Sequence, residues 1–234
     1  ISLGPNAVRG NCQSSKGNEL ITSLMLAESQ GKATGIVSTA RLTHATPAAT
    51  YAHSPERDWE SNDNLSEEAI AAGCKDIATQ LIEFPFGDGI DVALGGGKRH
   101  FIPKADGGKR TDSINLLKQW QSHYPQGKLV SNSQELMGID SQTTHKMLGL
   151  FNNSHMNYEA DRDLSTTGEP SLAEMTSKAI DVLANNEKGF FLMVEAGRID
   201  HGHHAGNAYR ALTDAIAFSD AVKAATENNK IDLA

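Results

Sequence analysis

The chain has no long hydrophobic run, no excess of basic residues and only two cysteines in 234 residues. No apolar run approaches the roughly 20 residues that a membrane-spanning helix needs. A net charge of −8 argues against non-specific nucleic-acid binding, which requires a basic surface. The sequence alone leaves open whether Cys12 and Cys74 pair or remain two independent buried thiols. A hydrophobic content of 38% suits a globular protein with one large core.

Helical and extended patterns alternate along the chain. Apolar residues recur at helical spacing between 18 and 30, Gly31 follows as a stop, and residues 34–39 read as a strand. Further helices are expected at 66–83, 113–121, 171–185 and 207–228, and Ser66 and Ser171 are expected to cap the first and third of these. Further strands are expected at 90–94, 128–131 and 190–195. This alternation predicts a single α/β domain over residues 1–234, a three-layer sandwich with a mostly parallel central sheet.

The segment from residue 189 to 206 holds the densest group of ligand-type side chains. Phe190 to Val194 predicts a short buried strand, and Glu195 follows at its end. Asp200 and His204 are four residues apart, so one helical turn would place both on the same face. That pair is typical of a zinc site, whereas Glu195 is a harder oxygen ligand that suits magnesium. An Asp–His pair at this spacing is more often a solvated helix face, but its place after a buried strand favours metal binding.

A second polar group follows the strand expected at 34–39. His44 and Thr46 come after that strand, and Pro47 is expected to start a short helix that runs through Ala52. Ligands of parallel sheets bind beyond the carboxyl ends of the strands, and Glu195 and Thr46 both fall there. We therefore expect Thr46, Glu195, Asp200 and His204 to converge on one side of the sheet.

Five segments resemble the alkaline phosphatases, most closely the animal-type branch that some bacteria also carry. V-E-A-G-R-I-D-H-G-H-H is similar to the metal-binding stretch of that family, and it lies at residues 194–204. Similar segments follow the family order at residues 35–59, 73–82, 92–99 and 149–159. The resemblance covers nearly the whole chain. It implies an alkaline-phosphatase-like fold, incomplete at both ends of this chain.

The resemblance also implies a metal-ligand set. Thr46 and Glu195 match magnesium ligands, and Asp200 and His204 match zinc ligands. His44 matches a position that acts through magnesium-bound water. The family pattern comprises two Zn²⁺ ions and one Mg²⁺ ion. Without the resemblance, Thr46 before a proline would be as readily a routine helix cap.

Two further positions match residues that contact phosphate in the family. Arg57 matches the arginine that binds the substrate phosphate in the family. An arginine suits this role because its planar guanidinium can donate two parallel hydrogen bonds to phosphate oxygens. The alternative is a surface arginine paired with Glu56 or Asp58. His201 matches a histidine or lysine that contacts phosphate through water, whereas His203 matches no residue of known role.

The resemblance implies hydrolysis of phosphate monoesters through a phosphoserine intermediate, by a homodimer outside the cell or in the periplasm. In the animal-type branch the positions of Cys12 and Cys74 form a disulfide, which fits an oxidising compartment. One alternative is another reaction of the same superfamily, the hydrolysis of phosphodiesters or sulfate esters. A second alternative is a metal-binding fragment without catalytic activity. Arg57 and the magnesium ligands favour monoesters, whose dianion needs more positive charge.

Two motifs mimic family features in the wrong place. Residues 86–89, F-G-D-G, are expected to form a turn, and Asp112 with Ser113 to cap the helix at 113–121. The family nucleophile lies upstream of this chain and further ligands lie downstream, so residues 231–234 would begin the next strand. The chain is therefore expected to be the middle of a longer protein and to be inactive alone.

Overall fold

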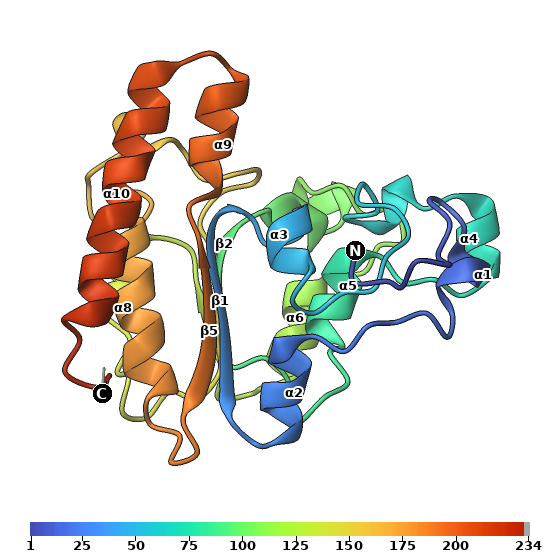
Figure 1. Ribbon diagram of the computed structural model, residues 1–234, viewed down its shortest axis with the longest axis horizontal. Coiled ribbons are helices and arrows are strands. Elements are labelled where there is room, and N and C mark those ends of the chain that lie inside the picture. The colour runs from blue at the N-terminus through green and yellow to red at the C-terminus, as the bar shows by residue number, and fades with distance from the viewer. Residues whose placement is uncertain (232–234) are drawn as a thin grey trace.

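A five-stranded parallel sheet separates two layers of helices in the computed structural model, which describes residues 1–231 (Figure 1). The strand order is β3-β4-β2-β1-β5, and every described pairing is parallel. The strands are β1 (Ala33–Arg41), β2 (Val92–Gly96), β3 (Lys128–Val130), β4 (Met147–Leu150) and β5 (Phe190–Glu195). The expected three-layer α/β sandwich is therefore confirmed.

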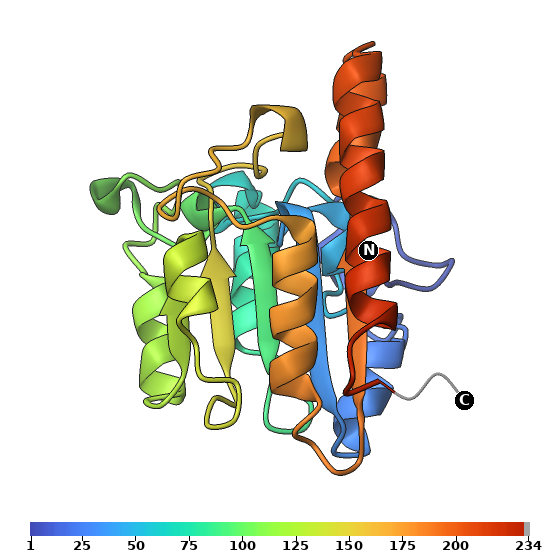
Figure 2. The same cartoon turned by 90° about the vertical axis from the view of Figure 1, so that its left-hand side faces the viewer.

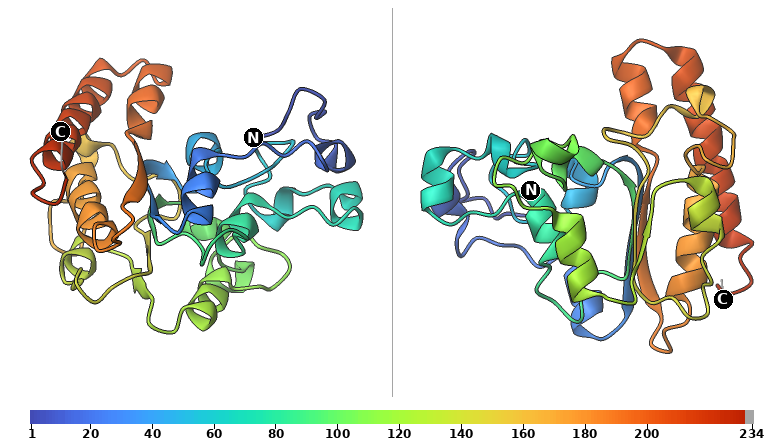
Figure 3. Two further views of the ribbon diagram at one scale, coloured as in Figure 1. Left: turned by 60° about the horizontal axis from the view of Figure 1, so that its bottom comes forward. Right: turned by 180° about the vertical axis from the view of Figure 1, so that it is seen from behind.

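Helices cover both faces of the sheet (Figures 1 and 3). One layer consists of α8 (Leu172–Leu183), α10 (Ala208–Thr226) and the short α7 (Ser133–Met137), whose Leu136 belongs to the core on that side, and α9 (Gly197–His204) rises beside α10 above the strand ends (Figures 1 and 2). The remaining helices are α1 (Cys12–Ser15), α2 (Ser23–Ser29), α3 (Ala45–Ala48), α4 (Glu67–Ala71), α5 (Ile77–Ile82) and α6 (Leu116–His123). Four short 3₁₀ helices are η1 (Asn62–Asn64), η2 (Lys98–His100), η3 (Lys104–Asp106) and η4 (Glu159–Asp161).

Each layer packs its own hydrophobic core against the sheet. On the α2, α5 and α6 side, Leu24, Ile77 and Trp120 pack with the buried side chains of that face of the strands. On the α8 side, Met175 and Val37 belong to the second core. Alternate residues of β1 thus point into opposite layers, since Ile36 belongs to the first core and Val37 to the second. Almost all of β1 is buried, as a central strand requires.

The single helix expected at 66–83 is wrong, because the chain forms α4 and α5 instead. Ser66 caps α4 as predicted, but Gly73 adopts a left-handed φ of +76° and ends it. Asp76 then caps α5 by accepting a hydrogen bond from Thr79 N. Cys74 lies in the break and forms a disulfide with Cys12, with Cα atoms 6.0 Å apart, which confirms the predicted reach of these two cysteines.

Several helix starts also differ from the sequence prediction. Asn115, rather than Asp112 or Ser113, caps α6, and Ser113 has a φ of +62° outside the helix. Helix α3 begins at Ala45, before Pro47, and ends at Ala48. Helix α2 is shorter than 18–30, because Thr22 caps it and the residues before Thr22 lie outside it. Ser171 caps α8 as predicted, and Asn207, the first residue of the helix expected at 207–228, caps α10.

Two features of the sheet were not predicted. The buried strand expected at 190–194 is β5, but it pairs only with β1 at the edge of the described sheet and is half-buried. Strand β4 was missed, although all four of its residues are buried.

No helix within residues 1–231 is long and apolar enough to cross a membrane. The strand expected to begin at 231–234 lies, apart from Ile231, outside the described residues.

Candidate functional site

The two signature segments meet at the carboxyl edge of β1 and β5. Ser38 of β1 is in register with Glu195 of β5, and the Ser38 hydroxyl donates a 2.6 Å hydrogen bond to Oε2 of Glu195. One residue further on, the Thr39 hydroxyl accepts a 3.3 Å hydrogen bond from Arg198 N. The edge therefore fixes the Glu195 carboxylate next to the start of α9.

Glycine at position 197 permits this close approach. A Cβ atom there would lie 2.9 Å from the Cβ of Ala40 and 3.2 Å from Cδ of Glu195. The first distance is shorter than ordinary van der Waals contact, so a larger residue would push α9 away from β1. Gly197 therefore allows α9 to begin directly after β5, with the Glu195 carboxylate beside the first turn of the helix.

Asp200 and His204 share one face of α9, as their spacing predicted. His204 Nε2 lies 3.4 Å from Asp200 Oδ1, and both side chains are largely exposed to solvent. Within residues 1–231, no third histidine, cysteine or carboxylate completes a compact metal-binding group with this pair. The described residues therefore supply two donors of the four that a tetrahedral zinc site requires.

His44 and Arg57 lie together beyond the end of β1. His44 immediately precedes α3, and its Nε2 is 3.0 Å from Nη2 of Arg57. Burial is the main cause that lowers the pKa of His44, and the charges of Arg41 and Arg57 lower it further. Arg57 is exposed and does not form the surface pair considered from the sequence, because Glu56 binds Arg9 instead.

His201 of α9 faces His44, with ring centroids 5.5 Å apart. Its Nδ1 lies 3.0 Å from Nη1 of Arg198. Burial first, and then the charge of Arg198, lowers the pKa of His201 to about 4, so the imidazole is neutral at pH 7. Thr46 is exposed on α3, which contacts β5, and its sharing of one ion with Glu195 stays a prediction. His203 is exposed on the same helix.

His155 is a component of this site that sequence reasoning missed. It lies in the loop after β4, with its ring centroid 5.1 Å from that of His44 and 4.2 Å from that of His201. It falls within the family-like segment at 149–159, but no role could be assigned to it there. Only the tertiary structure reveals the proximity, because more than 100 residues separate His155 from His44.

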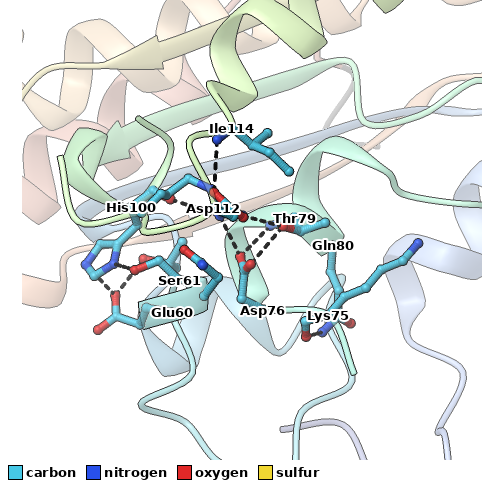
Figure 4. A network of polar contacts seen from close by, with 12 residues as sticks. Glu60, Ser61, Lys75, Asp76, Thr79, Gln80, His100, Asp112 and Ile114 are labelled. Atoms are coloured by element: carbon cyan, nitrogen blue, oxygen red, sulfur yellow. Dashed lines mark hydrogen bonds and ion pairs between the residues drawn. The ribbon is translucent and has the colours of Figure 1, made fainter. Parts of the chain in front are cut away.

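The two misplaced motifs lie elsewhere in the structure. Residues 86–89 form a turn at the amino edge of the sheet, where Asp88 is 3.0 Å from Nζ of Lys146. Asp112 binds Arg110 with an Oδ2–Nη2 distance of 2.5 Å, in the polar network shown in Figure 4. Asp112 is thus engaged in an ion pair.

Comparison with known proteins identifies the family. The alkaline phosphatase family model matches residues 6–233. The chain belongs to the alkaline phosphatase family. The rat tissue-nonspecific isozyme is 42% identical over 99% of this chain and 46% of its own length.

Solved structures agree with that assignment. The crystal structure of the Thermus thermophilus alkaline phosphatase is 32% identical over 95% of this chain and 44% of that chain, with a TM-score of 0.72. A TAB5 alkaline phosphatase variant with Mg bound in its M3 site has a TM-score of 0.67, and at 24% identity it supports the fold alone. The chain therefore spans about half the length of the relatives that it matches.

Proposed function

We propose that this chain is the central part of a metal-dependent phosphomonoesterase that works through a phosphoserine intermediate. The observation that carries the proposal is the Ser38–Glu195 hydrogen bond, because it joins the two family-like segments at one sheet edge. The serine nucleophile and the remaining ligands would belong to the part of the relatives' length that this chain does not span.

The donor atoms of the chain fit the metals of the family, which is metal-dependent. Thr46 and Glu195 offer the hard oxygen atoms that Mg²⁺ prefers. Asp200 and His204 offer the oxygen and nitrogen donors of a zinc site, and the intact protein would hold two Zn²⁺ ions. When bound, such ions stabilise the charge that develops on the entering and leaving oxygens.

Arg57, His201 and His44 at this edge would bind and orient the substrate. Arg57 is exposed, so its guanidinium is free to donate two parallel hydrogen bonds to the phosphate of a monoester. His201 is neutral at pH 7 and would contact that phosphate through water. His44 would hold a water molecule of the magnesium ion. Together these residues would position the phosphate for in-line attack.

The intact protein would act as a homodimer in the periplasm or outside the cell. The Cys12–Cys74 disulfide supports the location, because such bonds persist in oxidising compartments. We infer the homodimer from the resemblance to the alkaline phosphatase family.

Hydrolysis assays on a chain of the relatives' full length test the proposed function. We expect p-nitrophenyl phosphate to be hydrolysed faster than bis-p-nitrophenyl phosphate or p-nitrophenyl sulfate, and chelation to abolish the activity. Glu195→Gln and Asp200→Asn should each reduce kcat by at least about 100-fold, whereas Asp220→Asn, an exposed aspartate on α10, should not. A preference for the diester or sulfate would contradict the proposal.

A further inference from the structure

Three histidines from three different strand ends converge at the carboxyl edge of the sheet. His44 follows β1, His155 follows β4 and His201 lies in α9 after β5. One ring nitrogen from each lies within 4.8 Å of the others. Small side-chain rotations would bring such nitrogens around one ion, because zinc–nitrogen bonds are about 2.0–2.1 Å long.

The loop that carries His155 is held firmly between neighbouring segments. Gly97 N donates hydrogen bonds to the carbonyls of Asn152 and Ser154 at 3.0 and 2.7 Å, and Met156 N donates to the carbonyl of Thr39 at 3.0 Å. A Cβ atom on Gly96 would lie 2.2 Å from the Ser154 carbonyl oxygen, so glycine is required for this approach. The backbone therefore fixes the position of His155 before any ligand binds.

We propose that His44, His155 and His201 bind a divalent transition-metal ion through three imidazole nitrogens, with water or an anion at the remaining position. Imidazole suits zinc, nickel, cobalt and copper, and three histidines with one open position are a common arrangement for such ions. This site shares His44 and His201 with the proposed phosphatase function, but His155 has no role in that function and neither Asp200 nor Glu195 is needed here.

An unpartnered nitrogen supports ligation. Nδ1 of His44 is buried and lacks a hydrogen-bond partner within residues 1–231. An ion at the centre of the cluster would satisfy such a nitrogen.

Three arginines oppose the binding of a cation and set its selectivity. Arg41, Arg57 and Arg198 each contact one histidine of the cluster. Arg41 is largely neutralised, because its Nε and Nη2 bind the Glu60 carboxylate at 2.7 and 2.6 Å. Arg57 is exposed and can swing away from His44. The remaining positive charge favours an anion as the additional ligand and excludes hard ions such as Mg²⁺, which bind imidazole poorly.

Metal titration of the 234-residue chain tests the proposal. Calorimetry with Ni²⁺ and Co²⁺ is done on Asp200→Asn protein, which removes the Asp200–His204 pair as a competing site. We expect one ion to bind, His155→Asn and His201→Asn each to weaken binding by at least about 10-fold, and the exposed His203→Asn to change it less than 2-fold. Circular dichroism confirms that each variant is folded.

Two outcomes would overturn the proposal. Equal binding by His155→Asn, His201→Asn and His203→Asn would place the ion outside the cluster. An ion that binds the parent chain but is lost on Asp200→Asn would belong to the Asp200–His204 pair, which would leave the proposed phosphatase function intact. If His155→Asn fails to fold, His201→Asn alone decides, and Co²⁺ absorption spectra report whether nitrogen ligands have been lost.

Discussion

Ser38 and Glu195 face each other across β1 and β5, and the Ser38 hydroxyl donates a 2.6 Å hydrogen bond to Glu195 Oε2. The same hydroxyl oxygen accepts a 2.8 Å hydrogen bond from Ala40 N, which directs its hydrogen toward the carboxylate. Ser38 is fully buried, so this orientation does not compete with water. A serine on one strand thus positions a proposed magnesium ligand on the next.

Ser38→Ala should weaken Mg²⁺ binding about 10-fold without unfolding the protein, because it removes the group that orients Glu195. Calorimetric titration of a full-length chain with Mg²⁺ measures the effect. Ser29→Ala, at an exposed serine at the end of α2, is the matched control. Unchanged Mg²⁺ affinity in Ser38→Ala would show that Glu195 is oriented without this hydrogen bond.

Arg57→Ala should weaken inhibition of the full-length enzyme by inorganic phosphate about 10- to 100-fold and leave its zinc and magnesium content unchanged. The reason is that the guanidinium would contact the phosphate and not an ion. Arg57→Lys keeps the charge but loses the planar guanidinium, so we expect its inhibition by phosphate to lie between that of the parent and that of Arg57→Ala. Equal inhibition of all three proteins would show that Arg57 does not contact the phosphate.

Removal of the disulfide should lower the free energy of unfolding by about 4 kcal/mol, since the bond closes a loop with a sequence separation of 62 residues. Urea denaturation of a Cys12→Ser, Cys74→Ser double variant measures this change. Adding a reductant to the parent chain should reproduce it and leave the double variant unaffected. A reductant effect on the double variant would point to another cause.

Glu28→Gln should stabilise the protein at pH 8 by about 2 kcal/mol and have little effect near pH 4.5. Burial raises the pKa of Glu28 from 4.5 to about 7, although Thr34 donates a hydrogen bond to its carboxylate. The folded state therefore binds the proton more tightly than the unfolded state. The contribution of Glu28 to the free energy of unfolding consequently falls as the pH rises from about 4.5 to 7. Glutamine does not ionise, so the variant does not lose this stability at high pH.

Urea denaturation of parent and variant at several pH values between 4.5 and 8 measures the difference. Glu187→Gln, at an exposed glutamate, is the control and should show no such trend. A constant difference between Glu28→Gln and the parent over this range would mean that Glu28 keeps an ordinary pKa.

Arg110→Met should destabilise the protein by about 3–5 kcal/mol, because it leaves a buried carboxylate without its charge partner. Nη1 of Arg110 lies 3.1 Å from Oδ1 of Asp76, and these side chains are 2% and 3% exposed. Asp76 also caps α5, as Figure 4 shows through its bonds to Thr79. Thermal and urea unfolding measure the loss, with the exposed Lys104→Met as control. A change below 1 kcal/mol would refute the estimate.

The sequence by itself determined features that depend on neighbours along the chain. The spacing of Asp200 and His204 placed both on one helix face, because the helical period is local. Ser66 and Ser171 were recognised as caps for the same reason, since a cap bonds to backbone within three residues. Alternation of apolar segments predicted the α/β class, and the family-like segments predicted the family.

Only the tertiary structure decided features that depend on distant residues. It put β5 at the edge of the described sheet and divided the helix expected at 66–83 at Gly73, next to a disulfide whose partner is 62 residues away. It also brought His155 next to both His44 and His201. Their proximity follows from the strand order, which is fixed by hydrogen bonds and packing between segments far apart in the chain, and no local pattern encodes such contacts.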